Sequence, residues 1–158
     1  MLESRIVGRS MGIIIREAKK PDLEAILSLY GELEKDKSAV LDIKTAESLL
    51  DKMEKYPDYS IYVAELDHKV AGTFALAVMD NLGHMGAPSG LVEDVAVASD
   101  MQRRGIGKIM MEEAIRICKA KGCYKVMLSS NLKREAAHKF YESIGFKKHG
   151  YSFFTEIE

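Results

Sequence analysis

The feature that most constrains this chain is the segment Gln102-Arg103-Arg104-Gly105-Ile106-Gly107, which lies between a strand-like run and a long amphipathic helix. Glycines let backbone N–H groups approach a ligand closely, and a helix N-terminus carries a partial positive charge. The two arginines add charged donors. The segment therefore predicts a turn that binds phosphate or pyrophosphate, with a merely tight strand-to-helix turn as the alternative.

Two familiar phosphate-binding motifs do not fit this segment. A dinucleotide-binding fingerprint requires glycine at the position of Met110. A P-loop requires serine or threonine at Ile109 and glycine at Gln102. If the glycine segment binds phosphate, it therefore belongs to another class of phosphate site.

Hydrophobic periodicity predicts a mixed α/β domain rather than a doubly wound repeat. The expected order is one strand, two helices, three strands, a helix, a strand, a helix and closing strands. We expect the second helix to be capped by Thr45 and the longest helix to end at Gly122. The expected strands cover residues 13–15, 60–66, 70–79, 91–98, 124–129, 146–148 and 151–157. Two helices are expected to begin near residues 21 and 45, and two more to cover 104–121 and 133–144.

Length and charge limit the organisation and the partners. A chain of 158 residues favours one domain, which we place at residues 12–158 behind a loose N-terminal extension, residues 1–11. The 23 basic residues nearly balance the 24 acidic ones, which disfavours bulk nucleic-acid binding. The sequence contains no apolar run long enough for a membrane span and no secretory signal, so we expect a cytoplasmic protein without a membrane partner.

The two cysteines and four histidines do not predict a metal site or a disulfide. Cys118 and Cys123 do not form a CxxC pair, and no histidine follows at metal-ligand spacing. We expect reduced, mostly buried thiols and no bound metal.

Three motifs in order resemble the GNAT superfamily of acetyl-CoA-dependent N-acetyltransferases. They are the strand 91–97 (LVEDVAV), the glycine segment 102–107, and the segment 137–146 (AHKFYESIGF) that follows Ser129-Ser130-Asn131. The resemblance implies a single-domain GNAT fold of the α/β class. Its mixed, mostly antiparallel central sheet would be flanked by about four helices and splayed between the fourth and fifth strands.

The same resemblance implies acetyl-CoA as co-substrate and a set of contacts for it. The pyrophosphate would lie on the amides of the glycine segment, and the pantetheine arm would pair with the strand that precedes it. The implied cofactor-binding residues are Val95, Ala96, Val97, Gln102, Arg103, Arg104, Gly105, Ile106, Gly107, Lys108, Asn131, Ala137 and Phe140.

The chemistry implied is direct attack of an amine on the thioester, in a ternary complex and without a covalent enzyme intermediate. An alkyl amine has a pKa of about 10.4, so a base must first remove a proton. Neighbouring strand residues point to opposite faces, so only one of Glu93 and Asp94 readily faces the acceptor. We favour Glu93 as the base, with Asp94 or a water relay as alternatives. The resemblance places Tyr141 near the sulfur as the acid that protonates the departing thiolate.

The sequence constrains the identity of the acceptor amine less than it constrains the cofactor. Residues 91–97 and 122–125 resemble the branch that acetylates amino sugar phosphates, whereas residues 129–141 resemble the aminoalkylphosphonate branch. A small primary amine is the leading expectation, with a protein lysine or N-terminal amine as the alternative and a non-catalytic CoA-binding module as a further one. Many members of the superfamily form homodimers through C-terminal strands, for which Tyr151, Phe153 and Phe154 would be suited.

Overall fold

The computed structural model describes residues 5–6, 12–33 and 40–157. The chain divides into two compact units, residues 1–127 and 128–158. Each unit is described by itself below.

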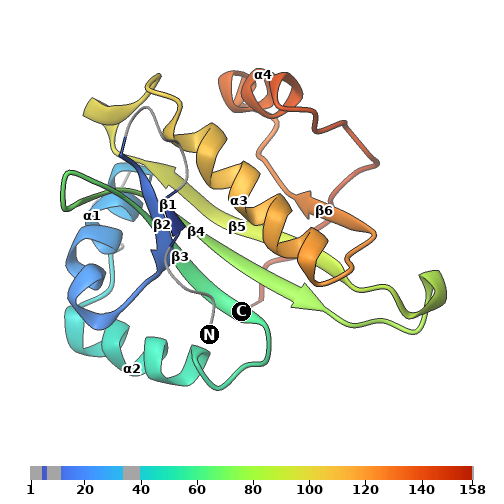
Figure 1. Cartoon of the computed structure of the whole chain (residues 1–158), viewed down its shortest axis with the longest axis horizontal. Coiled ribbons are helices and arrows are strands. Elements are labelled where there is room, and N and C mark those ends of the chain that lie inside the picture. The colour runs from blue at the N-terminus through green and yellow to red at the C-terminus, as the bar shows by residue number, and fades with distance from the viewer. Residues whose placement is uncertain (1–4, 7–11, 34–39, 158) are drawn as a thin grey trace. The chain divides into compact units, whose positions relative to one another are not determined.

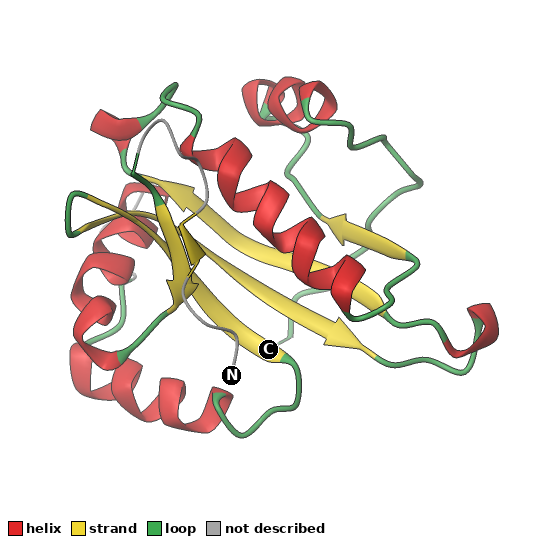
Figure 2. Ribbon diagram, viewed as in Figure 1, coloured by secondary structure: helices red, strands yellow, loops and turns green. Residues whose placement is uncertain are grey.

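The first unit is built on one sheet whose strands lie side by side in chain order. The first five strands pair antiparallel. The last two are linked by a helix, and their arrows point the same way in Figure 2. The sheet is therefore mixed and mostly antiparallel, as predicted. The strands are β1 (Arg5–Ile6), β2 (Ile14–Glu17), β3 (Tyr59–Leu66), β4 (Lys69–Met79), β5 (Ser89–Val97) and β6 (Lys125–Leu128).

Three α-helices of this unit cover the sheet: α1 (Leu23–Leu33), α2 (Ile43–Met53) and α3 (Ile106–Ala120). On β4, Gly72 faces Met110 of α3, whereas the next residue, Thr73, lies beside Tyr30 of α1. Successive strand residues point to opposite faces, so α1 and α3 cover opposite sides of the sheet (Figure 1). No helix among the described residues combines the length and apolarity that crossing a membrane requires.

Gly72 sets how closely α3 approaches the sheet. A Cβ at this position would lie 2.7 Å from the Met110 Sδ and 3.0 Å from the Ala96 carbonyl oxygen. Both contacts are tighter than packed side chains accept. The first turns of α3 therefore pack close to the backbone of β4, and a side chain at position 72 would require Met110 to shift.

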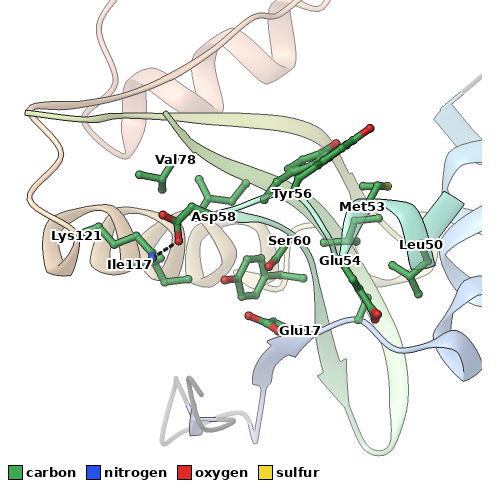
Figure 3. A pocket seen from close by; sticks show the side chains of 15 residues that line it. Glu17, Leu50, Met53, Glu54, Tyr56, Asp58, Ser60, Val78, Ile117 and Lys121 are labelled. Atoms are coloured by element: carbon green, nitrogen blue, oxygen red, sulfur yellow. Dashed lines mark hydrogen bonds and ion pairs between the residues drawn. The ribbon is translucent and has the colours of Figure 1, made fainter. Parts of the chain in front are cut away.

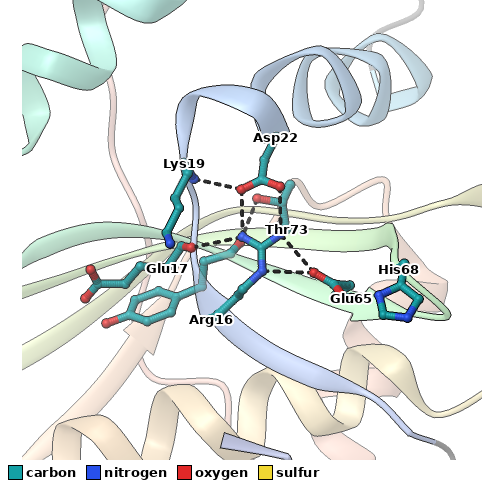
Figure 4. Close-up of polar contacts among 8 residues, drawn as sticks. Arg16, Glu17, Lys19, Asp22, Glu65, His68 and Thr73 are labelled. Atoms are coloured by element: carbon teal, nitrogen blue, oxygen red, sulfur yellow. Dashed lines mark hydrogen bonds and ion pairs between the residues drawn. The ribbon is translucent and has the colours of Figure 1, made fainter. Parts of the chain in front are cut away.

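A charged network ties the end of β2 to the start of α1 (Figure 4). The Arg16 guanidinium donates through both Nη atoms to Asp22, at 2.7 and 2.8 Å, and through Nε to Glu65 at 2.9 Å. The Lys19 backbone N–H also donates to Asp22, at 2.7 Å. Because Asp22 is buried and bidentate to Arg16, this network fixes the direction in which the chain enters α1.

Two predicted details of helix α2 and the loop before β5 differ from the structure. Asp42, not Thr45, caps α2: its carboxylate accepts the Thr45 N–H at 3.1 Å and the Thr45 hydroxyl at 2.6 Å. An aspartate three residues before threonine is the stronger acceptor. Strand β5 begins at Ser89, two residues earlier than the predicted strand 91–98.

The second unit holds helix α4 (Glu135–Ser143) and the C-terminal segment. The predicted closing strands at 146–148 and 151–157 are wrong, because the structure has no strand after residue 128 within the described range. The Phe146 N–H instead donates to the Tyr141 carbonyl at 3.0 Å, closing the helix. Tyr151 and Phe153 are about nine-tenths exposed, at 89% and 90%, so aromatic content alone did not produce a ladder.

Most of the predicted N-terminal extension lies outside the described residues. Arg5 and Ile6 are described, and they pair with Ile15 and Ile14 of β2 as a short edge strand.

We expect Asp22→Asn to destabilise the protein by about 2–3 kcal/mol at pH 7, because it removes a charge-assisted bidentate contact from a buried site. The Arg16 hydrogen bond holds the pKa of Asp22 below its ordinary value. A depressed folded-state pKa gives stability that is complete above the ordinary pKa and is lost as the pH falls through the folded value.

Urea denaturation between pH 7 and pH 2 measures this contribution. The free energy of unfolding of the wild type should fall below about pH 4, and that of Asp22→Asn should fall less over the same range. Parallel curves for the two proteins would contradict the assignment. Lys20→Ala, which removes an exposed ion pair with Asp51, is the matched control and should leave the free energy of unfolding nearly unchanged.

Candidate functional site

Helix α3 begins directly at the predicted glycine turn. Gly105 is its N-cap residue, with φ +78°, and no side chain caps the first turn. Arg103 is also left-handed, with φ +61°. The Ile109 N–H donates to the Gly105 carbonyl at 3.1 Å, so the amides of residues 105–108 precede the first helical bond. Four amide hydrogens at a positive helix end form a concave donor set suited to an anion.

Cationic side chains surround this turn. Arg103 and Arg104 are exposed, and among the ion pairs of the described residues neither takes part. The Lys108 Nζ lies 3.9 Å from the Oε1 of Glu112, one helical turn further along α3. Gln102 points back and donates to the Val97 carbonyl at 3.3 Å. The donors and charges that a pyrophosphate needs are therefore together at this end of α3.

Strand β5 carries a bulge where the two candidate bases lie. Glu93 pairs with Ala75 and Ala96 with Thr73, so three steps on β5 match two steps on β4. The extra residue is accommodated by Asp94, whose φ is +51°. Strict alternation was therefore the wrong expectation, because the bulge puts Glu93 on the same face as Ala96 and leaves both carboxylates exposed.

Two phenols lie close to these carboxylates. Burial, and then the charge of Asp94, raises the pKa of Tyr30 to about 12. The pKa of Tyr59 is raised by burial and then by Asp94 and Glu93. By the register, Glu93 shares a face with Ala96 opposite Thr73, which is the face that α1 covers, and the charge of Asp94 acts on both phenols. Protonated phenols beside carboxylates form a site that can hold and deprotonate an amine.

Beyond the bulge, β5 has an open edge. The Tyr124 N–H donates to the Pro88 carbonyl at 2.9 Å, which joins the beginnings of β6 and β5. Strand β6 has four residues and β5 has nine, so parallel pairing from that bond ends near Val92. In the described residues, Val97 pairs with Gly72 of β4, whereas Val95 lies in the bulge and has no partner in the register with β4. Apart from the Val97 carbonyl, which accepts from the Gln102 side chain, the outward backbone groups of this stretch need another partner, which an extended ligand can supply.

In the second unit, Tyr141 lies in a cluster of aromatic rings on α4. Its ring is 5.1 Å from that of Phe140 and 5.8 Å from that of Phe146. Burial raises the pKa of Tyr141, whereas Arg134 acts in the opposite direction. A raised pKa keeps the phenol protonated at neutral pH, as a proton donor requires.

Asn131 organises the turn that leads into α4. Its Oδ1 accepts the Lys133 N–H at 2.9 Å, and its carbonyl contacts the His138 Nε2 at 3.0 Å. Helix α4 begins at Glu135, two residues later than predicted, so Asn131 stabilises the preceding turn and is not the N-cap residue. Ala137 is half-buried one turn before Tyr141.

A separate cavity of about 270 Å³ opens at the edge of β3 where β2 has ended (Figure 3). Glu17, Glu54 and the ion-paired Asp58 and Lys121 line it together with tyrosines. Neither the bulge carboxylates nor the glycine turn contributes to this cavity. Tyr59 lies both in this cavity and near the bulge carboxylates.

The first unit thus brings together the predicted base residues and the predicted glycine turn on one strand–helix segment. Tyr141, Asn131, Ala137 and Phe140 belong to the second unit. Tyr59 and Thr73 were not predicted as site residues. Their signal in the sequence is their place on strands paired with β5, which requires the register to be known.

Comparisons with known proteins agree on one family. The sequence profile of the acetyltransferase (GNAT) family matches residues 23–146. A glucosamine 6-phosphate N-acetyltransferase of Trypanosoma brucei brucei is 25% identical over 142 residues, covering 85% of this chain and 89% of the relative.

Solved structures agree with this match. A structure from Agrobacterium tumefaciens superposes with a TM-score of 0.84 at 30% identity, covering 90% of this chain and 99% of that one. The glucosamine-6-phosphate N-acetyltransferase of Arabidopsis thaliana superposes with a TM-score of 0.80 at 23% identity, covering 92% and 99%, and shows the shared fold.

The bulge makes a prediction about backbone strain. Asp94→Val should lower the free energy of unfolding by about 1–2 kcal/mol, because a β-branched residue disfavours the left-handed conformation. Asp94→Asn keeps a residue that tolerates positive φ and should leave stability nearly unchanged. Thermal denaturation of the two variants measures the difference. Equal melting temperatures would mean that position 94 is not left-handed in solution.

Proposed function

Because this chain belongs to the acetyltransferase (GNAT) family, whose members use acetyl-CoA as co-substrate, we propose that it acetylates the primary amine of a small phosphorylated amino sugar or a closely similar metabolite. The chain is an acetyl-CoA-dependent N-acetyltransferase. The proposal concerns the acceptor and the roles of individual residues. The matched relatives of Trypanosoma and Arabidopsis are glucosamine 6-phosphate N-acetyltransferases, which supports an acceptor of that class.

The single observation that carries the proposal is the continuous β5–α3 segment. It presents two carboxylates at a bulge, then an open strand edge, then an uncapped helix N-terminus flanked by arginines. These three features match, in order, an amine to be deprotonated, an extended amide-containing arm and a pyrophosphate.

We assign cofactor binding to this segment. The amides of residues 105–108 would hold the pyrophosphate, with Arg103, Arg104 and Lys108 supplying charge and Gln102 orienting the turn. Backbone groups of Val95, Ala96 and Val97 would pair with the pantetheine arm. In the second unit, Asn131, Ala137 and Phe140 are assigned to cofactor binding by their places in the motif of the family. Acetyl-CoA brings the thioester that is attacked.

We assign the proton transfers to three side chains. Glu93 or Asp94, directly or through water, takes a proton from the ammonium group, since an alkyl amine is mostly protonated at pH 7. The neutral amine then attacks the thioester carbonyl, and the Val95 or Ala96 N–H donates to the oxygen that gains negative charge. Tyr141 gives its proton to the departing thiolate. The attack is direct, so no enzyme nucleophile is needed.

A panel of amines tests the proposed acceptor. With acetyl-CoA present, glucosamine 6-phosphate and related small amines should release free CoA thiol, which a thiol reagent detects. Release only with lysine peptides or peptide N-termini would favour a protein acetyltransferase. Thermal stabilisation by acetyl-CoA without thiol release on any amine would favour a non-catalytic binding module.

The variant Tyr141→Phe tests the proposed role of Tyr141 as the general acid. Loss of a positioned general acid should lower kcat by about 10²- to 10⁴-fold. The phenyl ring keeps the aromatic cluster, so the Kd for acetyl-CoA by calorimetry should change less than about threefold. Phe146→Leu, which alters the same cluster and removes no proton, is the control. An unchanged kcat in Tyr141→Phe would exclude it as the acid.

The pH–rate profile distinguishes the two candidate bases. The acidic limb of kcat/KM reports ionisation of the essential base in the free enzyme. We expect Glu93→Gln to abolish this limb and Asp94→Asn to retain it. The reverse result would assign the base to Asp94, and a limb that persists in both variants would favour a water relay without either carboxylate.

A further inference from the structure

Helix α3 ends in a left-handed turn that joins two residues five positions apart. Gly122 has φ +74°, and its N–H donates to the Lys119 carbonyl at 3.1 Å. The next N–H, of Cys123, donates to the Cys118 carbonyl at 2.9 Å. This pair of bonds is a Schellman motif, which places the side chains of its first and last residues against each other. In this chain both of those residues are cysteines.

The two thiols have different surroundings. Cys118 is buried and is 1% exposed, whereas Cys123 is partly exposed. A Cβ at Gly90 would overlap the Cys118 Sγ, so the sulfur fills the space that this glycine leaves. Burial raises the pKa of Cys118 to about 12, and the neighbouring Cys123 is the next largest cause. The backbone bond of the turn therefore joins a buried cysteine to a partly exposed one.

We infer that Cys118 and Cys123 are a redox modification site, in which the Schellman turn of α3 holds two thiols where they close to a reversible intramolecular disulfide. The oxidant is a peroxide or a small disulfide such as oxidised glutathione. The inference rests on the turn alone and is independent of the acceptor amine.

Oxidation of the two thiols by hydrogen peroxide proceeds in two steps. The more accessible Cys123 reacts first: its thiolate attacks one peroxide oxygen, the S–O bond forms, the O–O bond breaks, and water leaves after protonation. The Cys118 sulfur then attacks the sulfenic sulfur, the S–S bond forms, the S–O bond breaks, and a second water leaves. The two thiols lose two electrons and two protons, and the peroxide is reduced to two water molecules.

The disulfide would close a six-residue ring between the end of α3 and β6 and would withdraw the Cys118 sulfur from the space above Gly90. The glycine turn lies at the other end of the helix, fifteen residues long. Oxidation should therefore change the thiol count and melting temperature more than the affinity for acetyl-CoA.

Mass spectrometry of the full-length protein tests the inference. The reduced protein is equilibrated with mixtures of reduced and oxidised glutathione, the remaining thiols are blocked by alkylation, and the protein is digested with trypsin. We expect the peptides 117–119 (ICK) and 122–125 (GCYK) to appear joined, with the mass of two hydrogens lost. A reductant should separate them again. Alkylation of both cysteines throughout the titration would overturn the inference.

Single-thiol variants supply the controls. Cys123→Ser should show no joined peptide, and its buried Cys118 should remain a free thiol under the same mixtures. Cys118→Ala should leave Cys123 carrying glutathione. A wild type that accumulates glutathione on Cys123 with Cys118 still free, or a disulfide between two chains, would also overturn the inference. If Cys118→Ala does not fold, the peptides of the wild type alone decide between these outcomes.

Discussion

The site depends on one constraint: backbone N–H and C=O groups that leave a regular ladder must find other partners. In three consecutive parts of the chain, backbone groups lie outside a regular ladder. The bulge at Asp94 interrupts pairing with β4, the short β6 ends before Val95, and Gly105 opens α3 without a side-chain cap. A polar, extended molecule with an anionic end satisfies all three. The geometry that defines the site is therefore a property of the main chain, and the side chains add charge and proton transfer.

In the first unit, positive and negative charge lie at two different places. Positive charge is concentrated at the start of α3, in Arg103 and Arg104. Negative charge lies at the bulge, where Asp94 and Glu93 act on partly buried phenols. The separation follows from chain order, since β5 leads directly into the helix. A ligand that is anionic at one end and approached by a cationic amine at the other meets complementary charge at both positions.

The local pattern of the sequence predicted the β5–α3 segment well, because its signals lie within a few residues: a β-branched strand, glycines and a helical apolar stripe. The bulge was not predictable, since it exists only relative to the register of β4. Tyr59 was missed for the same reason, because its nearness to Glu93 is set across two strand pairs. The C-terminal aromatic residues show the converse. Tyr151 and Phe153 suit a strand, but propensity without a pairing edge yields none.

Gly72 has a consequence for how this enzyme tolerates change. Its missing Cβ lets Met110 and Ile106 of α3 lie close to β4, beside the Ala96 carbonyl of β5. A methyl group at position 72 would press on the Met110 sulfur and on that carbonyl oxygen, so the packing beneath the first turns of the helix would have to adjust. A position without reactive atoms therefore links the sheet to the helix that follows the glycine turn.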